Sequence, residues 1–132
     1  MLDAHAALCY LRLEKGYELV KNALKKAEKT ETPILMCEIN IGEVCYIALR
    51  AGLTPNVEDF LNLFLSLPIH PITVNFELIK EAAKIKAIYP LSYADAFAIA
   101  TAIREDATII TGDPEFRQVE NVVSIEWLSP LS

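Results

Sequence analysis

Apolar and polar residues follow two different periods along the chain, and the period predicts the type of each element. Apolar residues recur every three to four positions in six stretches, which predict helices at 6–13, 17–29, 39–51, 54–66, 75–88 and 93–105. Short apolar or β-branched runs predict strands at 1–3, 34–37, 69–74, 108–111 and 122–125. Strands that alternate with helices indicate a parallel sheet covered on both faces. The predicted fold is therefore α/β, a three-layer α/β/α sandwich with a central parallel sheet.

Residues that favour helix starts support these boundaries. Polar residues able to accept a hydrogen bond from the first turn precede four of the helices: Asn40, Thr54, Asn75 and Ser92. Gly16 separates the first two helices, and Gly52 is a suitable C-terminal stop for the third. Pro71 has no backbone N–H to donate, so we expect the strand 69–74 at an edge of the sheet.

The composition is typical of one folded unit, which we expect to span residues 1–132. Hydrophobic residues make up 53% of the chain and charged residues 23%, which argues against disorder. No apolar run approaches the roughly 20 residues that cross a bilayer, and no signal-peptide pattern is visible, so we expect a cytoplasmic protein without membrane contact. The three cysteines lack C-x-x-C spacing and are expected to be buried thiols, with a disulfide or zinc site as the alternative.

The charge distribution limits the ways in which this chain can bind nucleic acid. A net charge of −6 argues against coating nucleic acid by bulk electrostatics. Six of the basic residues, however, fall between Arg12 and Lys29. This stretch is either a solvated helix face or a local contact strip for phosphates. In the second interpretation, Arg12 and Lys15 are candidate substrate-binding residues.

Acidic residues gather at one predicted edge of the sheet. Right-handed crossovers place the C-terminal end of each strand on the same edge as the start of the helix that follows, and ligands bind along that edge. Asp106 precedes a strand and falls on the opposite edge. Four other acids follow strand ends or helix starts: Asp3, Glu43, Asp95 and Asp113.

Each of these acids also has a structural interpretation. Asn40-x-x-Glu43 and Ser92-x-x-Asp95 are spaced as capping boxes. Asp113 before Pro114 is typical of a turn or helix start, and Asp3 could simply end a strand. Four carboxylates on one edge, however, repel one another and raise each other's pKa unless a cation is present. Oxygen ligands without Cys or His favour Mg²⁺ or Mn²⁺ over zinc.

Four stretches also resemble a known family. LDAHAALCYL, INIGEVCYIALR, LSYADAFAIATAI and ATIITGDPEF resemble, in order and spacing, the four acidic motifs of PIN-domain nucleases, and within that family the VapC toxins of toxin–antitoxin pairs. The resemblance runs over nearly the whole chain. Its most specific part is the pair LSYADAFAIATA and TGDPEF.

The resemblance implies a site, a sheet order and partners. It places Asp3, Glu43, Asp95 and Asp113 on the family's acidic, metal-binding positions and Thr111 on a hydroxyl position near the metal. It implies the strand order 3-2-1-4-5, an RNA substrate, a homodimer and a cognate antitoxin protein. The chain departs from the family in two places: only Met1 and Leu2 precede Asp3, and His5 stands where a small polar residue is common. His5 is either a substrate contact or a partly exposed residue at a helix start.

These observations predict a ribonuclease that depends on Mg²⁺ or Mn²⁺ and serves as the toxin of a VapBC-type pair. The carboxylates would hold one or two ions that activate water for attack on a phosphodiester. The alternatives are a non-catalytic PIN-like module that binds RNA or protein, and a DNA-directed nuclease with the same carboxylates. Apolar residues on the helices 54–66 and 75–88 are candidates for the dimer surface: Phe60, Phe64, Phe76 and Ile79.

Overall fold

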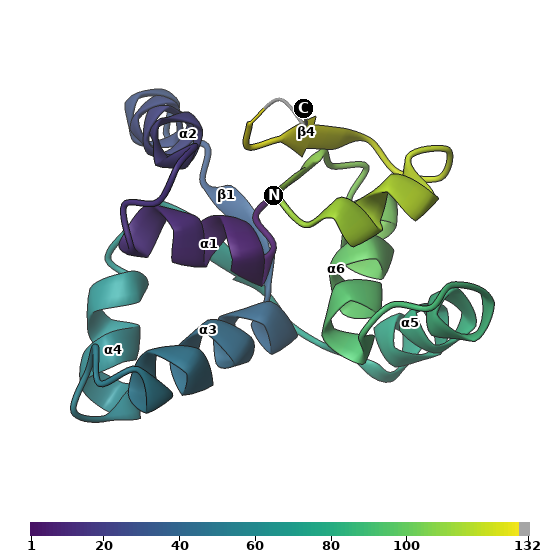
Figure 1. Ribbon diagram of the computed structural model, residues 1–132, viewed down its shortest axis with the longest axis horizontal. Coiled ribbons are helices and arrows are strands. Elements are labelled where there is room, and N and C mark those ends of the chain that lie inside the picture. The colour runs from purple at the N-terminus through teal and green to yellow at the C-terminus, as the bar shows by residue number, and fades with distance from the viewer. Residues whose placement is uncertain (130–132) are drawn as a thin grey trace.

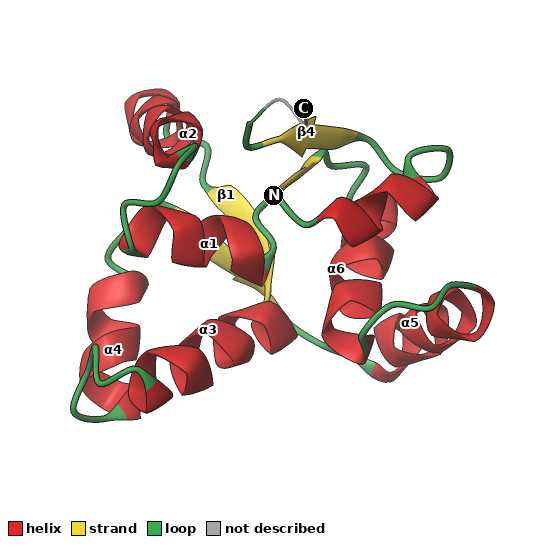
Figure 2. Cartoon of the chain, in the orientation of Figure 1, coloured by secondary structure: helices red, strands yellow, loops and turns green. Residues whose placement is uncertain are grey.

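Short parallel strands form the middle of the molecule, and helices pack around them (Figures 1 and 2). The computed structural model describes residues 1–129. The strands are β1 (Ile34–Cys37), β2 (Ile69–Ile72), β3 (Ile109–Thr111) and β4 (Ile125–Trp127). The helices are α1 (Ala4–Leu11), α2 (Tyr17–Thr30), α3 (Glu38–Arg50), α4 (Val57–Phe64), α5 (Phe76–Ile88), α6 (Tyr93–Arg104) and the 3₁₀ helix η1 (Pro114–Val119).

Leu2 joins two pairs of strands into one parallel array. β1 pairs with β2, and β3 pairs with β4. The Leu2 N–H donates to the Leu35 carbonyl at 3.0 Å, and Leu2 forms a parallel bridge with Ile110. The resulting order is β2, β1, Leu2, β3, β4, which confirms the predicted order 3-2-1-4-5. The first strand is reduced to a single bridge because Asp3, the next residue, already caps α1.

Alternate residues of the strands point to opposite faces of the sheet, and both faces are covered. Met36 and Ile110 pack in a core cluster with α1, α2, α3 and α4. The neighbouring residues, Cys37 and Ile109, pack in two further clusters that contain residues of α6. This alternation follows from the two-residue period of a strand. It confirms the predicted three-layer arrangement, in which α5 and α6 lie side by side (Figure 1).

Several predicted boundaries are confirmed, because local side chains set them. Asn75 accepts a hydrogen bond from the Leu78 N–H at 2.9 Å, and Ser92 accepts one from the Asp95 N–H at 3.1 Å. Both residues therefore cap their helices as predicted. β2 pairs only with β1 among the described strands, so Pro71 lies on an edge strand.

Two predicted helix caps are wrong. Asn40 is not the N-cap of α3, because that helix begins at Glu38 directly after β1, and Asn40 is buried inside it. Thr54 does not cap α4 either. Asn56 does so, by accepting a hydrogen bond from the Asp59 N–H at 2.8 Å.

The last predicted strand and part of the predicted dimer surface also differ from the structure. The final strand is 125–127 rather than 122–125, since η1 and the turns after it occupy residues 114–123. Phe60 and Phe64 are buried in the core and stack on each other, with ring centroids 5.4 Å apart. They are therefore not free to form a dimer surface, whereas Phe76 is 70% exposed.

The cysteines form no disulfide, and no described helix suits a membrane span. All three cysteines are free and buried, as predicted: Cys9, Cys37 and Cys45. Among the described helices, none combines the length and the apolar character needed to cross a bilayer.

Two glycines allow a matched test of how closely the chain packs around Gly16. Gly16 adopts φ +98°, and a Cβ there would lie 2.8 Å from the carbonyl oxygen of Leu128. Gly42 lies inside α3, and a Cβ added there would meet no other atom within 4 Å. We expect Gly16→Ala to lower the free energy of unfolding by more than about 1 kcal/mol, and Gly42→Ala to raise it by about 0.5–1 kcal/mol. Urea denaturation measures both changes, and a shift of the two variants in the same direction would contradict this account.

Candidate active site

Asp3 is held by both the sheet and a helix. Its backbone N–H donates to the Ile110 carbonyl at 3.4 Å, which places the residue at the carboxyl end of the Leu2 bridge. Its Oδ1 accepts from the Ala6 N–H at 2.8 Å and caps α1. Its Oδ2 accepts from the Thr111 hydroxyl. With two hydrogen-bond partners and only 2% of the residue's surface exposed, this carboxylate has a fixed orientation.

Thr111 connects Asp3 to the next acid along the edge. The Thr111 hydroxyl donates to Asp3 and accepts from the Asp113 N–H at 3.1 Å. Asp113 follows β3 and in turn accepts from the Glu115 N–H at 2.9 Å, which starts η1. Thr111 therefore lies between two of the predicted acids, where it can orient both.

Asp95 and Glu43 reach the same region from two helices. Asp95 lies in the first turn of α6, behind the Ser92 cap, and Glu43 lies on α3. The two helices are tied by Asn40, whose Nδ2 donates to the Ala94 carbonyl at 3.0 Å. Asn40 is fully buried, and its Oδ1 has no partner among the described residues. The residue predicted to cap α3 instead sets the position of α3 against the start of α6.

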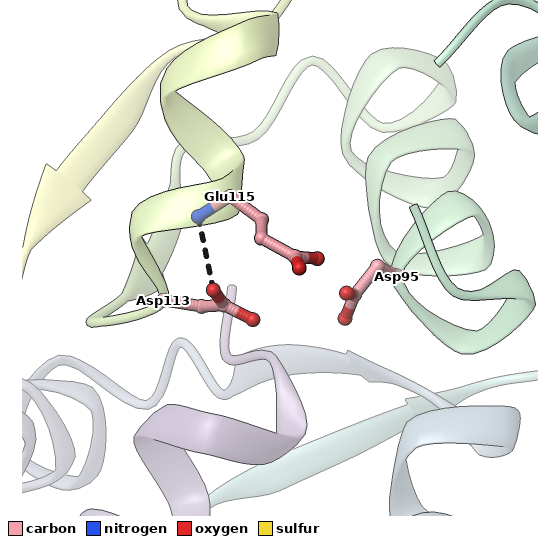
Figure 3. A group of neighbouring side chains, drawn as sticks. All are labelled: Asp95, Asp113 and Glu115. Atoms are coloured by element: carbon pink, nitrogen blue, oxygen red, sulfur yellow. Dashed lines mark hydrogen bonds between the residues drawn. The ribbon is translucent and has the colours of Figure 1, made fainter. Parts of the chain in front are cut away.

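The tightest group of carboxylates includes one acid that the sequence analysis missed. Oxygens of Asp95, Asp113 and Glu115 all lie within 4.8 Å of one another. Figure 3 shows these side chains pointing into a shared space, with Asp95 on α6 facing the other two. Glu115 was missed because η1 was not predicted. The only signal for it was its place two residues after Asp113 in the TGDPEF stretch.

The pKa values show that the four predicted acids share one electrostatic environment with Glu115. The pKa of Asp3 is raised to about 7, mainly by burial; hydrogen bonds from Thr111 and Ala6 oppose the rise, and the charges of Asp95 and Asp113 add to it. Burial also raises the pKa of Asp95 to about 6, with added repulsion from Asp113, Glu43 and Glu115 and an opposing hydrogen bond from Ser92. Burial raises the pKa of Glu43, the Asn40 side chain lowers it, and the Asp113 charge raises it. Asp95, Asp113 and Glu115 therefore form the centre of an acid cluster, and Asp3 and Glu43 lie at its margin, where the charges of the central acids still raise their pKa values.

The profile of the PIN domain matches residues 1–122. This chain belongs to the PIN domain family. No curated protein sequence matches it.

Solved structures resemble this PIN domain in fold. One is a toxin–antitoxin complex from Klebsiella pneumoniae, with a TM-score of 0.72 and 15% identity, where the match covers 98% of each chain. Another is VapBC2 from Rickettsia felis bound to a DNA fragment from their promoter, with a TM-score of 0.72, 19% identity and 96% of each chain covered. At these identities the likeness shows the fold alone.

The donor set of this PIN domain fits a hard divalent cation. Asp95, Asp113 and Glu115 offer carboxylate oxygens from two sides of one small space. Mg²⁺ and Mn²⁺ prefer several carboxylate oxygens that lie close together. A cation would also offset the mutual repulsion of carboxylates that are partly or fully buried. The pattern of raised pKa values thus agrees with a site that is adapted to hold positive charge.

The three residues predicted to bind substrate lie at different distances from the acids. His5 is exposed on α1, and its ring lies against Gly112: a Cβ at Gly112 would come within 2.7 Å of His5 Cε1. His5 therefore lies beside the loop that carries Asp113. Arg12 follows the C-terminal end of α1, roughly 14 Å along the helix axis from Asp3. Lys15 lies in the exposed loop before α2, and its neighbour Gly16 packs against Leu128, whose side chain also lies against Gly112.

The raised pKa values predict how metal-free stability depends on pH. The folded protein holds protons on Asp3 and Asp95 more tightly than the unfolded chain does. Their contribution to stability is complete below the ordinary Asp value of 3.8 and is lost as the pH rises through about 6 and about 7. In EDTA we expect the Tm to fall between about pH 4 and about pH 7, and Asp3→Asn to flatten this dependence.

Thermal unfolding across that pH range provides the measurement, and Asp106→Asn provides the control. Asp106 lies between α6 and β3, away from the cluster, with φ +50°, a backbone conformation that Asn also tolerates. In the control variant, the Tm should depend on pH with the same slope as in wild type. An identical slope in wild type and Asp3→Asn would show that Asp3 is ionised in the metal-free protein.

Proposed function

We propose that this PIN domain is a ribonuclease that depends on Mg²⁺ or Mn²⁺ and uses Asp3, Glu43, Asp95, Asp113 and Glu115. The observation that carries the proposal is the convergence of Asp95, Asp113 and Glu115 within 4.8 Å at the carboxyl edge of the sheet. Asp3 and Glu43 lie in the same electrostatic environment. The ligands of such α/β sheets bind at this edge.

The residues divide into those that would hold the ion and those that orient them. Asp95, Asp113 and Glu115 would hold it, since their oxygens are the closest together. Asp3 would add carboxylate charge at the margin of the site, while the Thr111 hydroxyl donates to Asp3 and accepts from the Asp113 N–H, which fixes both residues. Glu43 is half-buried with a raised pKa, which suits a group that holds or accepts a proton beside the reacting phosphate. A bound Mg²⁺ or Mn²⁺ supplies Lewis-acid chemistry, activating water and offsetting charge on phosphate oxygens.

We further propose that the chain is the toxin of a toxin–antitoxin pair and acts as a homodimer. Two of the solved structures that resemble this chain are complexes of that kind. A protein antitoxin would bring positive charge to the acid cluster, and arginine matches carboxylates best. The dimer remains a prediction, for which exposed apolar residues such as Leu63, Phe76 and Ile88 offer surface.

The first test is cleavage. We expect wild type to cut single-stranded or structured RNA in Mg²⁺ or Mn²⁺ and to stop in EDTA, because every oxygen-rich donor group in the cluster is a carboxylate. Asp95→Asn should lower the rate at least tenfold, by about 1.4 kcal/mol or more of transition-state stabilisation. Asp106→Asn, the same change away from the cluster, should leave the rate unchanged.

Gel-based cleavage with labelled RNA measures these rates, and excess DNA competitor identifies the preferred substrate. Cleavage that persists in EDTA and survives every carboxylate substitution would rule out the proposed mechanism. Preferential cutting of DNA would assign the same site to a DNA-directed nuclease.

A second test separates metal binding from helix capping at Asp95. If Asp95 mainly stabilises the start of α6, its replacement by Asn should lower metal-free stability by roughly 0.3–1 kcal/mol. If it belongs to the repelling cluster, metal-free stability should hold steady or rise, and the gain in Tm on adding Mn²⁺ should shrink. We expect the second pattern, and the same loss of metal response for Glu115→Gln.

Differential scanning calorimetry with and without Mn²⁺ measures the metal-free stability and the rise in Tm that the metal causes. A lower Tm without metal, together with an undiminished metal-induced rise, would make Asp95 a capping residue. An undiminished rise for Glu115→Gln would remove Glu115 from the proposed ligands.

A further inference from the structure

A line of side chains on α3, half-buried at Glu43 and exposed at Tyr46 and Arg50, leads away from the candidate site. Glu43, Tyr46 and Arg50 are spaced three and four residues apart, so they lie on one face of the helix. Arg50 is roughly 10 Å farther along the axis than Glu43. The helix starts close to α6 and runs toward α4 (Figure 1). An acid of the site is thus followed, on the same face, by an aromatic ring and then by a cation.

The surface beside this line is hollowed. An open depression of about 380 Å³ is lined by Ile39, Glu43 and Tyr46 of α3 and by Ser92 and Ala94 at the start of α6. Glu43 therefore belongs to both the acid cluster and the depression. Ala94 directly precedes Asp95, so a group seated in the depression would lie next to the carboxylates. The volume falls in the lower part of the range for small-molecule sites, which suits a group the size of one nucleoside.

The ring of Tyr46 is available for stacking. Tyr46 is 47% exposed, and the Arg50 guanidinium lies over its ring, 5.2 Å from the centroid. A ring in this position offers a flat apolar surface, and Arg50 adds positive charge that the acid cluster lacks. Bases of single-stranded nucleic acid stack on such rings, whereas bases inside a duplex have their faces covered.

We propose that Tyr46 and Arg50, with the depression beside them, form a subsite for one unpaired RNA base next to the phosphate that is cut. This inference rests on the proposed nuclease function and goes beyond it by naming the residues that hold the base beside the cut. The Tyr46 ring stacks on the base. Arg50 supports the ring and contacts the adjoining phosphate.

The chain contains a matched control pair. Phe76 and Lys80 on α5 form the same kind of exposed cation–π pair, with Lys80 Nζ 5.8 Å from the ring centroid. Asn75, the cap of α5, accepts from Arg104 at 3.4 Å, so Phe76 lies near the end of α6 that is opposite Asp95. Phe76→Ala therefore removes an exposed aromatic ring that also lies under a cation, and it leaves the candidate site unchanged.

The first experiment measures kcat and KM on a short single-stranded oligouridylate in Mn²⁺. Tyr46→Ala should lower kcat/KM by about 5- to 150-fold, mainly through KM, and Tyr46→Phe should stay within about twofold of wild type because the ring remains. Because Phe76 is also a candidate for the dimer surface, light scattering first establishes that Phe76→Ala has the wild-type mass, and its kcat/KM should then match wild type. Replacing the nucleotide next to the cut with an abasic one should remove the difference between wild type and Tyr46→Ala.

The second experiment detects the contact between Tyr46 and the RNA base without relying on activity. An oligonucleotide containing 5-iodouridine is irradiated with the Asp95→Asn protein, and the attached peptide is identified by mass spectrometry. We expect attachment at Tyr46, and this result does not depend on whether Tyr46→Ala folds. Attachment elsewhere, or equal kcat/KM for Tyr46→Ala and Phe76→Ala, would overturn the subsite while leaving the nuclease in place. A wild-type protein that cuts no RNA would overturn both.

Discussion

The hydrogen bond from the Thr111 hydroxyl to Asp3 connects nearly every feature of this molecule that bears on its function. Asp3 follows the single bridge that joins the two strand pairs, and the same carboxylate caps α1. Thr111 ends β3 and also accepts from the Asp113 backbone. A carboxylate this deeply buried needs fixed partners, because an unpaired buried charge is costly. The sheet, the first helix and the loop carrying Asp113 are thereby held in one arrangement.

That arrangement leaves the acids near one another at a cost in stability. Asp3 and Asp95 both have raised pKa values because they are buried beside like charges. Functional sites are where such shifts concentrate, since the fold maintains a geometry that local energetics alone would disfavour. A cation would relieve the repulsion, so we expect folding and metal binding to be coupled in this family member.

The acid cluster also constrains how a polyanion can approach. With a net charge of −6, the protein as a whole repels nucleic acid. Contacts that do not depend on net charge therefore become important near the site. A half-exposed aromatic ring on α3 provides such a contact, since stacking is available to every base.

Much of the site could be predicted from the sequence because its parts follow from local rules. The period of apolar residues identifies the elements, and Asn75 and Ser92 cap their helices through hydrogen bonds that span only three residues. The right-handed crossover then places Asp3, Glu43, Asp95 and Asp113 at one edge without any coordinates. The order of the strands came from the resemblance to PIN domains, and the structure confirms it.

Other features depend on contacts between distant segments, which no local pattern encodes. Asn40 has the spacing of a cap but is buried, donating instead to Ala94, 54 residues away. Glu115 joins Asp95 only because η1 turns back toward α6, and Phe60 is buried only because α4 packs against the core. The sequence by itself determined the elements and the edge on which the acids gather, since both follow from short-range sterics and hydrogen bonding. Tertiary structure alone decided which carboxylates meet and which apolar rings stay exposed, because those depend on how separate elements pack.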